Sequence, residues 1–330
     1  MTDHTETFIE WFGRGLEIKD VDPALDMSNY FFDRFEYNSE QQLWITWIYG
    51  TTYHWPTAYV VWNEFPDMEL VGVERLRDWN NSNYTRLRYQ TDTKWNKGHL
   101  AEQFVSYKQF VGGRTQREAL TENFVGDPVK DFYTLWDTVN NLHKFGRYTS
   151  WFYIQALKQT CGIDVDVDGL WLHDYSGSKS HRNGLCYAVG KPEWVDSKKN
   201  RVKLDATQVD FLEGKGREIL EEVKLRYPHV ADKADFFAME TSLCSFKKLF
   251  RRSRGRYLGY YLDRQAEEID KVAADKWDGI DWQPLWDSRN EVVDFSWLMG
   301  RIDSNLYNIF LDTGDFEPRD RGTGLEEFFV

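Results

Sequence analysis

Apolar residues recur at helical spacing through most of this 330-residue chain, and few stretches alternate between apolar and polar residues as a half-buried strand does. Near the N-terminus, for example, Phe8, Phe12 and Leu16 follow the helical spacing. Comparable patterns follow one another after short breaks at Pro, Gly and Asn, and we find no internal repeat. The periodicity predicts an all-α protein of about a dozen helices.

The predicted helices divide into two parts that pack together as one unit. Residues 1–190 are predicted to form a helical core with a tight turn and a carboxylate cluster. Residues 191–330 are predicted to form a C-terminal helical part with a basic patch, and 191–205 is the predicted connector.

Composition narrows the class of protein. Aromatic residues make up 17% of the chain and include 15 Trp, which predicts a well-buried core and some aromatic surface for stacking. Neither an apolar run of membrane-spanning length nor a signal-peptide pattern occurs, so we expect a cytoplasmic protein without a membrane partner. The three Cys are widely spaced and the seven His form no HExxH pattern, which predicts reduced core thiols and no dedicated metal site.

Charge is unevenly distributed. The net charge of −13 argues against nonspecific coating of nucleic acid. The window 247–256 nevertheless holds six Lys and Arg residues and no acid, and tyrosines follow it. A local basic patch on an acidic protein is suited to binding a polyanion at one place, and the predicted DNA contacts there are Lys247, Arg251, Arg252 and Arg254.

The stretch Leu142 to Asp168 combines a glycine turn, a helix and a carboxylate cluster. Gly146 is predicted to adopt the positive φ of a sharp turn between two helices. Backbone N–H groups at the start of the second helix, at Gly146, Arg147 and Tyr148, are then suited to hold a phosphate. No GxxxxGK[ST] phosphate loop occurs in the chain, so kinase or ATPase chemistry has no support.

Two polar segments follow that helix. Asp164, Asp166 and Asp168 alternate, so an extended backbone would place all three carboxylates on one side. Residues 174–190 are predicted to be a loop dense in hydrogen-bond donors, with Ser180, His181, Arg182 and Asn183 among them. The two segments either face each other across a pocket or are an acidic loop and a polar loop in solvent.

A later helix, predicted over 235–250, contains Glu240 within an otherwise apolar sequence. Such a glutamate is either turned to the surface or a buried functional acid. The sequence alone leaves both alternatives open.

LHKFG at 142–146 resembles the hairpin signature of helix-hairpin-helix DNA glycosylases, with Lys144 in place of the first glycine of LPGVG. In that family a catalytic aspartate follows about twenty residues after the last glycine, a distance that leads here to Asp166, with Asp168 beside it. The resemblance implies hairpin amides that hold a DNA phosphate and an aspartate that faces a flipped base. It does not imply β-lyase activity, since Tyr148 stands where lyase members have lysine.

FGRYTSWFYIQAL, SKSHRNGL and METSLCSFKK together resemble the glycosylase-fold proteins of bacteriophage thymidine hypermodification, over about 25–270. These proteins are the amino acid:DNA transferases and the α-glutamyl/putrescinyl thymine pyrophosphorylases. The resemblance implies a helix-hairpin-helix glycosylase-like domain with additional C-terminal helices. It also implies that an amino acid or polyamine displaces pyrophosphate from pyrophosphorylated 5-hydroxymethyluracil in double-stranded DNA, in the host cytoplasm and beside a 5-hydroxymethyluracil DNA kinase.

The resemblance gives the marked residues roles in that substitution. Asp166 or Asp168 would accept the proton of the amine, with Glu240 sharing that work, and Arg182, Lys179 and Lys248 would stabilise the pyrophosphate. Ser180, His181 and Asn183 complete the expected substrate-binding set. No cofactor is firmly implied, although Mg²⁺ bridging the pyrophosphate and the aspartates is compatible with this chemistry. The alternatives are a glycosylase that excises a modified base and a non-catalytic DNA-binding partner of a base-modifying kinase.

Overall fold

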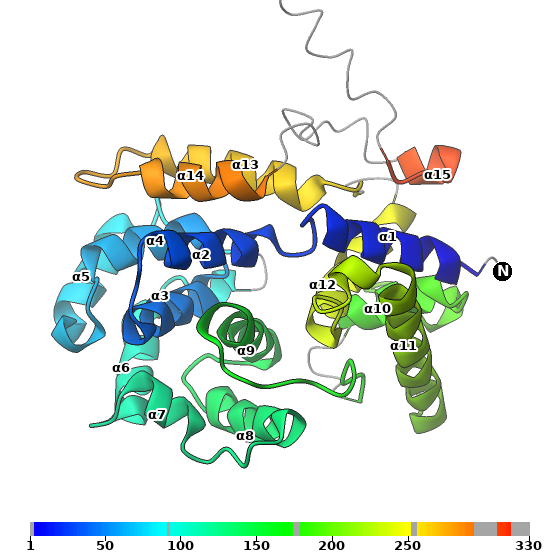
Figure 1. Ribbon diagram of the computed structural model, residues 1–330, viewed down its shortest axis with the longest axis horizontal. Helices are drawn as coiled ribbons and strands as arrows, with labels where there is room; N and C mark the ends of the chain where they lie inside the picture. Colours follow the sequence, from blue (N-terminus) through cyan, green and yellow to red (C-terminus); the bar gives the residue numbers. More distant parts are fainter. Residues whose placement is uncertain (1–2, 91–92, 174–178, 252–255, 294–308, 318–330) are drawn as a thin grey trace, which may run out of the picture. The chain divides into compact units, whose positions relative to one another are not determined.

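The computed structural model describes residues 3–90, 93–173, 179–251, 256–293 and 309–317. Within these ranges the regular structure is helical and contains no strand, which confirms the predicted all-α class (Figure 1). The finer expectation, a helix-hairpin-helix glycosylase-like fold, stays a prediction. None of the described helices is long and apolar enough to cross a membrane.

The chain folds into two compact units, and each unit is assembled from separate segments. The first unit takes its described residues from Met1–Pro23, Val167–Ala266 and Val293–Val330, and the second from Ala24–Asp166 and Glu267–Val292. The units therefore do not divide at the connector expected near residue 191. Helix α13 (Tyr260–Ala273) begins in the first unit and ends in the second.

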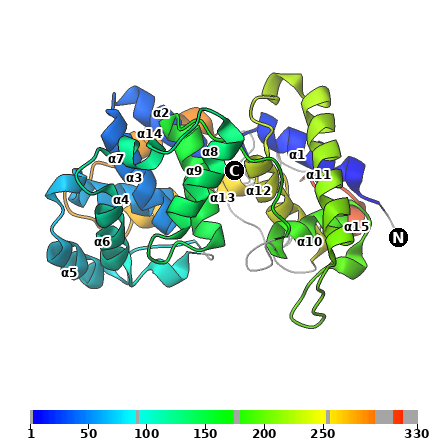
Figure 2. The ribbon, with the colours of Figure 1, turned by 90° about the horizontal axis from the view of Figure 1, so that it is seen from below.

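The second unit is built around α3 and α9, which lie side by side (Figures 1 and 2). Gly50 of α3 allows the close approach, because a Cβ there would lie 2.7 Å from a ring carbon of Tyr153. Aromatic side chains fill the core, as the composition predicted; Trp44 stacks on Trp47 at 5.1 Å. The helices of this unit are α2 (Pro23–Arg34), α3 (Ser39–Thr52), α4 (Trp55–Glu64), α5 (Val73–Asn83), α6 (Leu100–Val111), α7 (Gln116–Thr121), α8 (Pro128–Asn140), α9 (Arg147–Cys161) and α14 (Gln283–Val292), with short 3₁₀ turns η1 (Met68–Leu70) and η2 (Lys94–Asn96).

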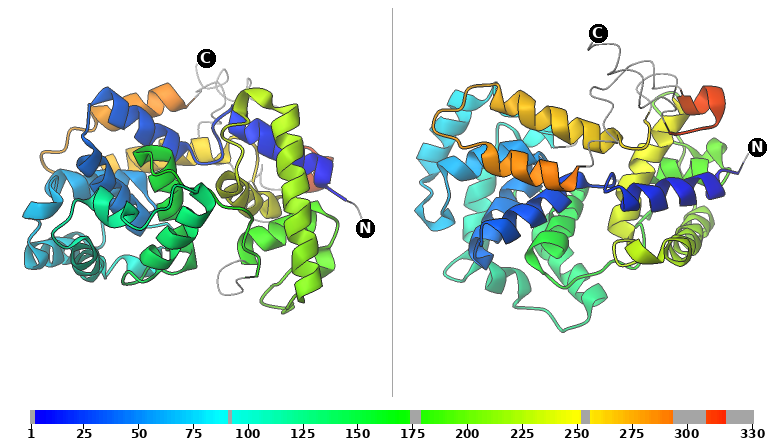
Figure 3. Two further views of the ribbon diagram at one scale, coloured as in Figure 1. Left: turned by 60° about the horizontal axis from the view of Figure 1, so that its bottom comes forward. Right: turned by 45° about the horizontal axis from the view of Figure 1, so that its top comes forward.

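The first unit packs α10 against α12, and α1 against α11 and α12 (Figure 3). Gly184 lets α10 approach the α12 backbone, since a Cβ at this position would lie 2.1 Å from the carbonyl oxygen of Leu243. The helices of this unit are α1 (Thr5–Glu17), α10 (Lys179–Ala188), α11 (Ala206–Arg226), α12 (Phe236–Phe246) and α15 (Ile309–Thr313), with 3₁₀ turns η3 (Pro192–Trp194), η4 (Pro228–Val230) and η5 (Lys247–Phe250).

One predicted loop is a helix. Residues 179–188, expected to lie in a loop, form α10, while 174–178 lie outside the described residues. The many polar residues of this segment suggested a loop, but His181, Leu185 and Cys186 lie at helical spacing and are all buried. Tertiary burial of one helical face therefore outweighs the weak helix propensity of Ser, His, Asn and Gly.

Candidate active site

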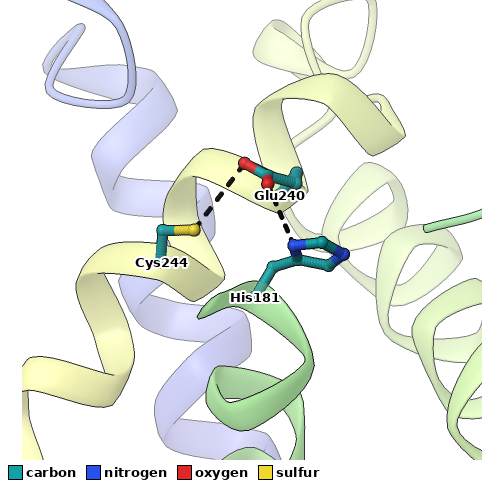
Figure 4. Close-up of side chains that lie close together, drawn as sticks. All are labelled: His181, Glu240 and Cys244. Carbon is teal, nitrogen blue, oxygen red and sulfur yellow. Dashed lines mark hydrogen bonds and ion pairs between the residues drawn. The ribbon is translucent and has the colours of Figure 1, made fainter. Parts of the chain in front are cut away.

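Three chemically active side chains converge between α10 and α12, and we call them the buried cluster: His181, Glu240 and Cys244 (Figure 4). His181 Nδ1 lies 2.9 Å from Glu240 Oε1, and both side chains have no exposed surface. The Cys244 thiol lies 3.7 Å from the other carboxylate oxygen, Oε2, and is half-buried. Glu240 is thus buried, which excludes the surface-turned alternative, and its functional role stays a prediction.

Local sequence explains why these groups meet. Glu240 and Cys244 are four residues apart on α12, so they lie one above the other on the same face of the helix. Asp235 caps the helix by accepting a hydrogen bond from the backbone N–H of Ala238, which fixes where α12 begins. Close packing at Gly184 then brings α10, and His181 with it, against that face.

The hydrogen bonds of His181 fix its protons. Nε2 lies 3.2 Å from the carbonyl oxygen of Leu170, and because a carbonyl can only accept, Nε2 carries a proton and donates it. The short contact between Nδ1 and Glu240 then requires one proton between them, since two lone pairs would repel each other. The pair is therefore neutral overall, whichever atom holds the shared proton.

Glu213 of α11 holds the backbone segment to which His181 donates its hydrogen bond. Its carboxylate accepts hydrogen bonds from the backbone N–H groups of Leu170, at 2.9 Å, and Leu172, at 2.7 Å. These bonds hold the segment whose carbonyl receives the His181 proton. The orientation of the imidazole is thus set by a second, buried glutamate.

A partly exposed rim lies next to the buried cluster, and we define it as Ser180, Lys247 and Lys248. The Lys247 ammonium donates a hydrogen bond to the Ser180 hydroxyl, which also interacts with the Cys244 thiol. Burial and the nearby Arg256 lower the pKa of Lys248 to about 7, and burial and Glu240 raise the pKa of Cys244 to about 12. The rim therefore combines the positive charge of Lys247 with a Lys248 that is about half protonated near pH 7, beside a protonated thiol.

The other predicted substrate contacts on α10 have partners inside the first unit. Arg182 is 1% exposed, and its guanidinium lies 3.4 Å from the carbonyl of Val202. The amide of Asn183 donates to the backbone carbonyl of Asp196 and accepts from its N–H. These contacts show what holds the two side chains, and substrate binding by them stays a prediction. Lys179 pairs with the Asp196 carboxylate at 3.0 Å.

The three aspartates alternate with buried apolar residues, and a hydrogen bond from the Val165 N–H to the Ile163 carbonyl turns the backbone at Asp164. Ile163, Val165 and Val167 are buried, whereas Asp164 and Asp168 are exposed. Asp166 is half-buried and pairs with Lys158 at 3.1 Å. The two units meet along the chain between Asp166 and Val167, so Asp168 belongs to the first unit, which holds the buried cluster, and Asp166 to the second.

The predicted phosphate corner differs from expectation in its backbone. Gly146 has φ −94°, so the predicted positive φ at this residue is wrong, and Lys144 instead adopts φ 64°. Lys144 is the position at which the resembled hairpin motif has its first glycine, so the turn occurs two residues earlier than we expected. Arg147 is buried, with its guanidinium 4.3 Å from the ring centre of Trp151, and Tyr148 stacks on Phe152.

Part of the predicted basic patch is described. Arg251 is exposed, and with Lys247 and Arg256 it acts electrostatically on Lys248, so these four cations are close together. Arg252 and Arg254 lie outside the described residues. DNA binding by this patch stays a prediction.

Sequence reasoning missed two members of the site. Cys244 was expected to be an ordinary core thiol, although its four-residue spacing from Glu240 was a usable signal. Glu213 lies in a strongly charged stretch of sequence, and nothing in the sequence indicated its bonds to Leu170 and Leu172. Among the described residues, the buried cluster is also the group whose donor atoms could hold a metal ion, since they all lie within 4.8 Å of one another.

The chain belongs to the amino acid:DNA transferase family, because the model of this family matches residues 19–255. That range contains the buried cluster and the rim, and the predicted membership in this family is confirmed. A relative, the serinyltransferase of Salmonella phage ViI, is 29% identical over 263 residues. The match covers 76% of this chain and 63% of that protein, so the chain spans less than two thirds of the relative's length. No solved structure matches the chain.

Proposed function

We propose that this protein transfers an amino acid to a pyrophosphorylated 5-hydroxymethyluracil base in phage DNA and releases pyrophosphate. Family membership supports transfer of an amino acid to DNA, and the name of the relative makes serine the first amino acid to test. The observation that carries the proposal is the cationic rim above a buried acid–imidazole–thiol cluster in one unit.

The reaction needs positive charge at the leaving group. A C–O bond between the base methylene and the diphosphate breaks, a C–N bond to the amino group forms, and the amine loses a proton. Negative charge therefore accumulates on the departing pyrophosphate, which Lys247 and Lys248 are suited to stabilise because both are partly exposed beside Ser180. The buried cluster beneath them holds the two helices that carry these groups.

A carboxylate is the simplest acceptor for the proton of the amine. We assign this role to Asp168, because it is exposed and shares the first unit with the rim, whereas Asp166 belongs to the second unit. Glu240 has no exposed surface, so its part in the proposed reaction is to orient His181 and Cys244.

The DNA must present its base to this site. A base inside a duplex is reached only when it is flipped out of the stack or lies in an open strand. Arg251 and the backbone N–H groups at the start of α9 remain the proposed phosphate contacts. A 5-hydroxymethyluracil DNA kinase in the host cytoplasm would supply the activated base.

The direct test incubates the purified protein with DNA that carries pyrophosphorylated 5-hydroxymethyluracil and with single amino acids, serine first. Mass spectrometry of the digested nucleosides should find the amino acid joined to the base, with an equal amount of free pyrophosphate. Abasic sites without an adduct would point to a glycosylase, and absence of both products with every amino acid would reject the transferase.

Two matched pairs of variants test the assignments. Lys247→Ala should lower the rate at least about 100-fold, the usual effect of losing one transition-state contact, while the exposed Lys199→Ala should not. Asp168→Asn should lose the product with DNA binding intact, while Asp164→Asn in the same acidic run should keep it. Equal loss in both members of a pair would contradict the assignment.

A further inference from the structure

We propose that His181, Glu240 and Cys244 form a binding site for one zinc-type divalent cation. The proposal stands on the geometry of the buried cluster and does not depend on the proposed transfer reaction. Imidazole nitrogen, carboxylate oxygen and thiolate sulfur are the three donor types that zinc takes in proteins, and a thiolate with an imidazole disfavours Mg²⁺ and Ca²⁺.

The spacing of the donors fits a tetrahedral ion. Zinc lies about 2.0–2.3 Å from such donors, which places two donors of one ion roughly 3.3–3.6 Å apart. The observed separations are 2.9 Å between Nδ1 and Oε1 and 3.7 Å between Sγ and Oε2, and all three donor atoms lie within 4.8 Å. Only small side-chain rotations are needed for the three donors to close on an ion.

The surroundings of His181 match those of a metal ligand. A ligating histidine usually donates its other ring N–H to a carbonyl or carboxylate, which fixes the tautomer and directs the free lone pair at the ion. Nε2 of His181 donates to the Leu170 carbonyl, and Glu213 holds Leu170 in place. Nδ1 is thereby directed toward Glu240 and Cys244.

Charge balance permits an ion at a site in which the side chains of His181 and Glu240 have no exposed surface. Without metal, the short contact between His181 and Glu240 requires one shared proton, and a cysteine thiol with its ordinary pKa of about 8.5 is protonated at neutral pH, so the cluster is neutral. A Zn²⁺ ion that displaces these two protons leaves neutral imidazole, carboxylate and thiolate around a doubly positive ion, and the cluster is again neutral. Each ion bound should therefore release two protons, and no net charge is buried.

Such an ion would join α10 to α12. Ser180 precedes the His181 ligand, and the rim lysines follow Cys244 by one turn of helix, so the ion would fix the rim from both sides. Among the described residues, three side chains could bind the ion. A tetrahedral zinc ion has four ligands, so its fourth coordination position would be open to a water molecule or a substrate atom.

The test uses the full chain, stripped with a chelator and titrated with Zn²⁺ or with Co²⁺ as a coloured substitute. We expect one ion per chain by elemental analysis, two protons released per ion, and a sulfur-to-cobalt charge-transfer band. Mg²⁺ should not compete. A chain that binds no Zn²⁺, or binds it without the charge-transfer band and the two protons, overturns the proposal.

Variants form a graded series. Cys244→Ser should abolish the charge-transfer band and weaken binding by more than 100-fold, while Glu213→Gln, which alters only the support of His181, should weaken it by roughly 10- to 100-fold. Cys186→Ser removes a buried thiol from the same unit and should leave affinity and spectrum unchanged. Circular dichroism verifies that each variant folds. An unchanged charge-transfer band in folded Cys244→Ser would refute the site. Proton release is measured on the wild-type chain, so this part of the test holds even if a variant does not fold.

Discussion

Each unit contains a buried histidine that faces a glutamate, and the two pairs differ in what else the histidine binds. In the second unit, His54 Nε2 lies 3.5 Å from Glu268 Oε2, and His54 Nδ1 accepts a hydrogen bond from the backbone N–H of Thr57. His54 is therefore the N-cap of α4. Glu268 also accepts from the Gln90 amide and is 14% exposed.

In the first unit, the two ring nitrogens of His181 have other partners than those of His54. Nε2 donates to a backbone carbonyl, and Nδ1 shares a proton with a carboxylate that reaches a thiol. Neither histidine nor glutamate has exposed surface there, and lysines stand next to them. A buried histidine–glutamate pair is therefore structural at one place and a candidate reactive centre at the other, and the neighbours decide which.

The largest expected difference concerns the loss of each carboxylate. Glu240→Ala leaves His181 buried without its charge partner and should lower the free energy of unfolding by about 3–5 kcal/mol. Glu268→Ala removes a longer, partly solvated contact, so we expect about 1 kcal/mol. Urea unfolding of both variants measures the two losses, and equal values would erase the distinction between the pairs.

Two aspartates at helix starts extend the comparison to pH. In the first unit, Asp20 accepts hydrogen bonds from the N–H groups of Gly259, Tyr261 and Leu262, yet burial raises its pKa to about 7. In the second unit, Asp127 caps the exposed start of α8, and the hydrogen bond from the N–H of Lys130 lowers its pKa.

The two pKa shifts have opposite consequences for stability. Because the pKa of Asp20 is raised above its usual 3.8, its contribution is largest below pH 3.8 and is lost as the pH rises to about 7, by on the order of 2–4 kcal/mol. The lowered pKa of Asp127 gives a contribution that is present above pH 3.8 and lost as the pH falls. Unfolding free energies from pH 3 to 8 should show that Asp20→Asn removes the first slope and Asp127→Asn the second; a shared direction would contradict the assignment.

Local patterns predicted most helices well but not all of their ends. Asp127-Pro128 is the pattern of an N-cap followed by proline and starts α8, and Gly162, in the left-handed conformation that glycine favours, ends α9. Ser39 with Gln42 and Asn38 with Gln41 both satisfy the spacing rule of a capping box, and the structure uses Asn38 with Gln41 as the cap of α3. The polar run at 80–83 has the composition of a helix break, yet it lies within α5.

The candidate site was only half visible in the sequence. His181 and Glu240 were marked as candidates because polar residues in a dense segment and an acid in an apolar helix are unusual. Their contact joins positions 59 residues apart in the sequence and depends on the close approach of two helices at Gly184. Helical periodicity shows which face of a helix is buried but not which other helix packs against it. The division of the chain into two units between Asp166 and Val167 has no marker in the amino-acid composition.

The smallest expected effect concerns the helix contacts that hold each unit together. Gly184→Ala directs a Cβ at the carbonyl oxygen of Leu243, a backbone atom that cannot rotate away, so α10 must shift from α12 and we expect a loss of about 1–3 kcal/mol. Gly50→Ala places a Cβ between α3 and α9 against the side chain of Tyr153. The Cβ of Tyr153 is among the atoms it meets and cannot rotate away, so we expect a similar loss of stability.

The two variants differ in the zinc titration: Gly184→Ala should weaken Zn²⁺ binding because it moves His181, and Gly50→Ala should not. Gly146→Ala, where a Cβ meets no atom and φ is −94°, serves as the control and should change neither quantity. If Gly50→Ala weakened Zn²⁺ binding as much as Gly184→Ala, the ion would not depend on the α10–α12 contact.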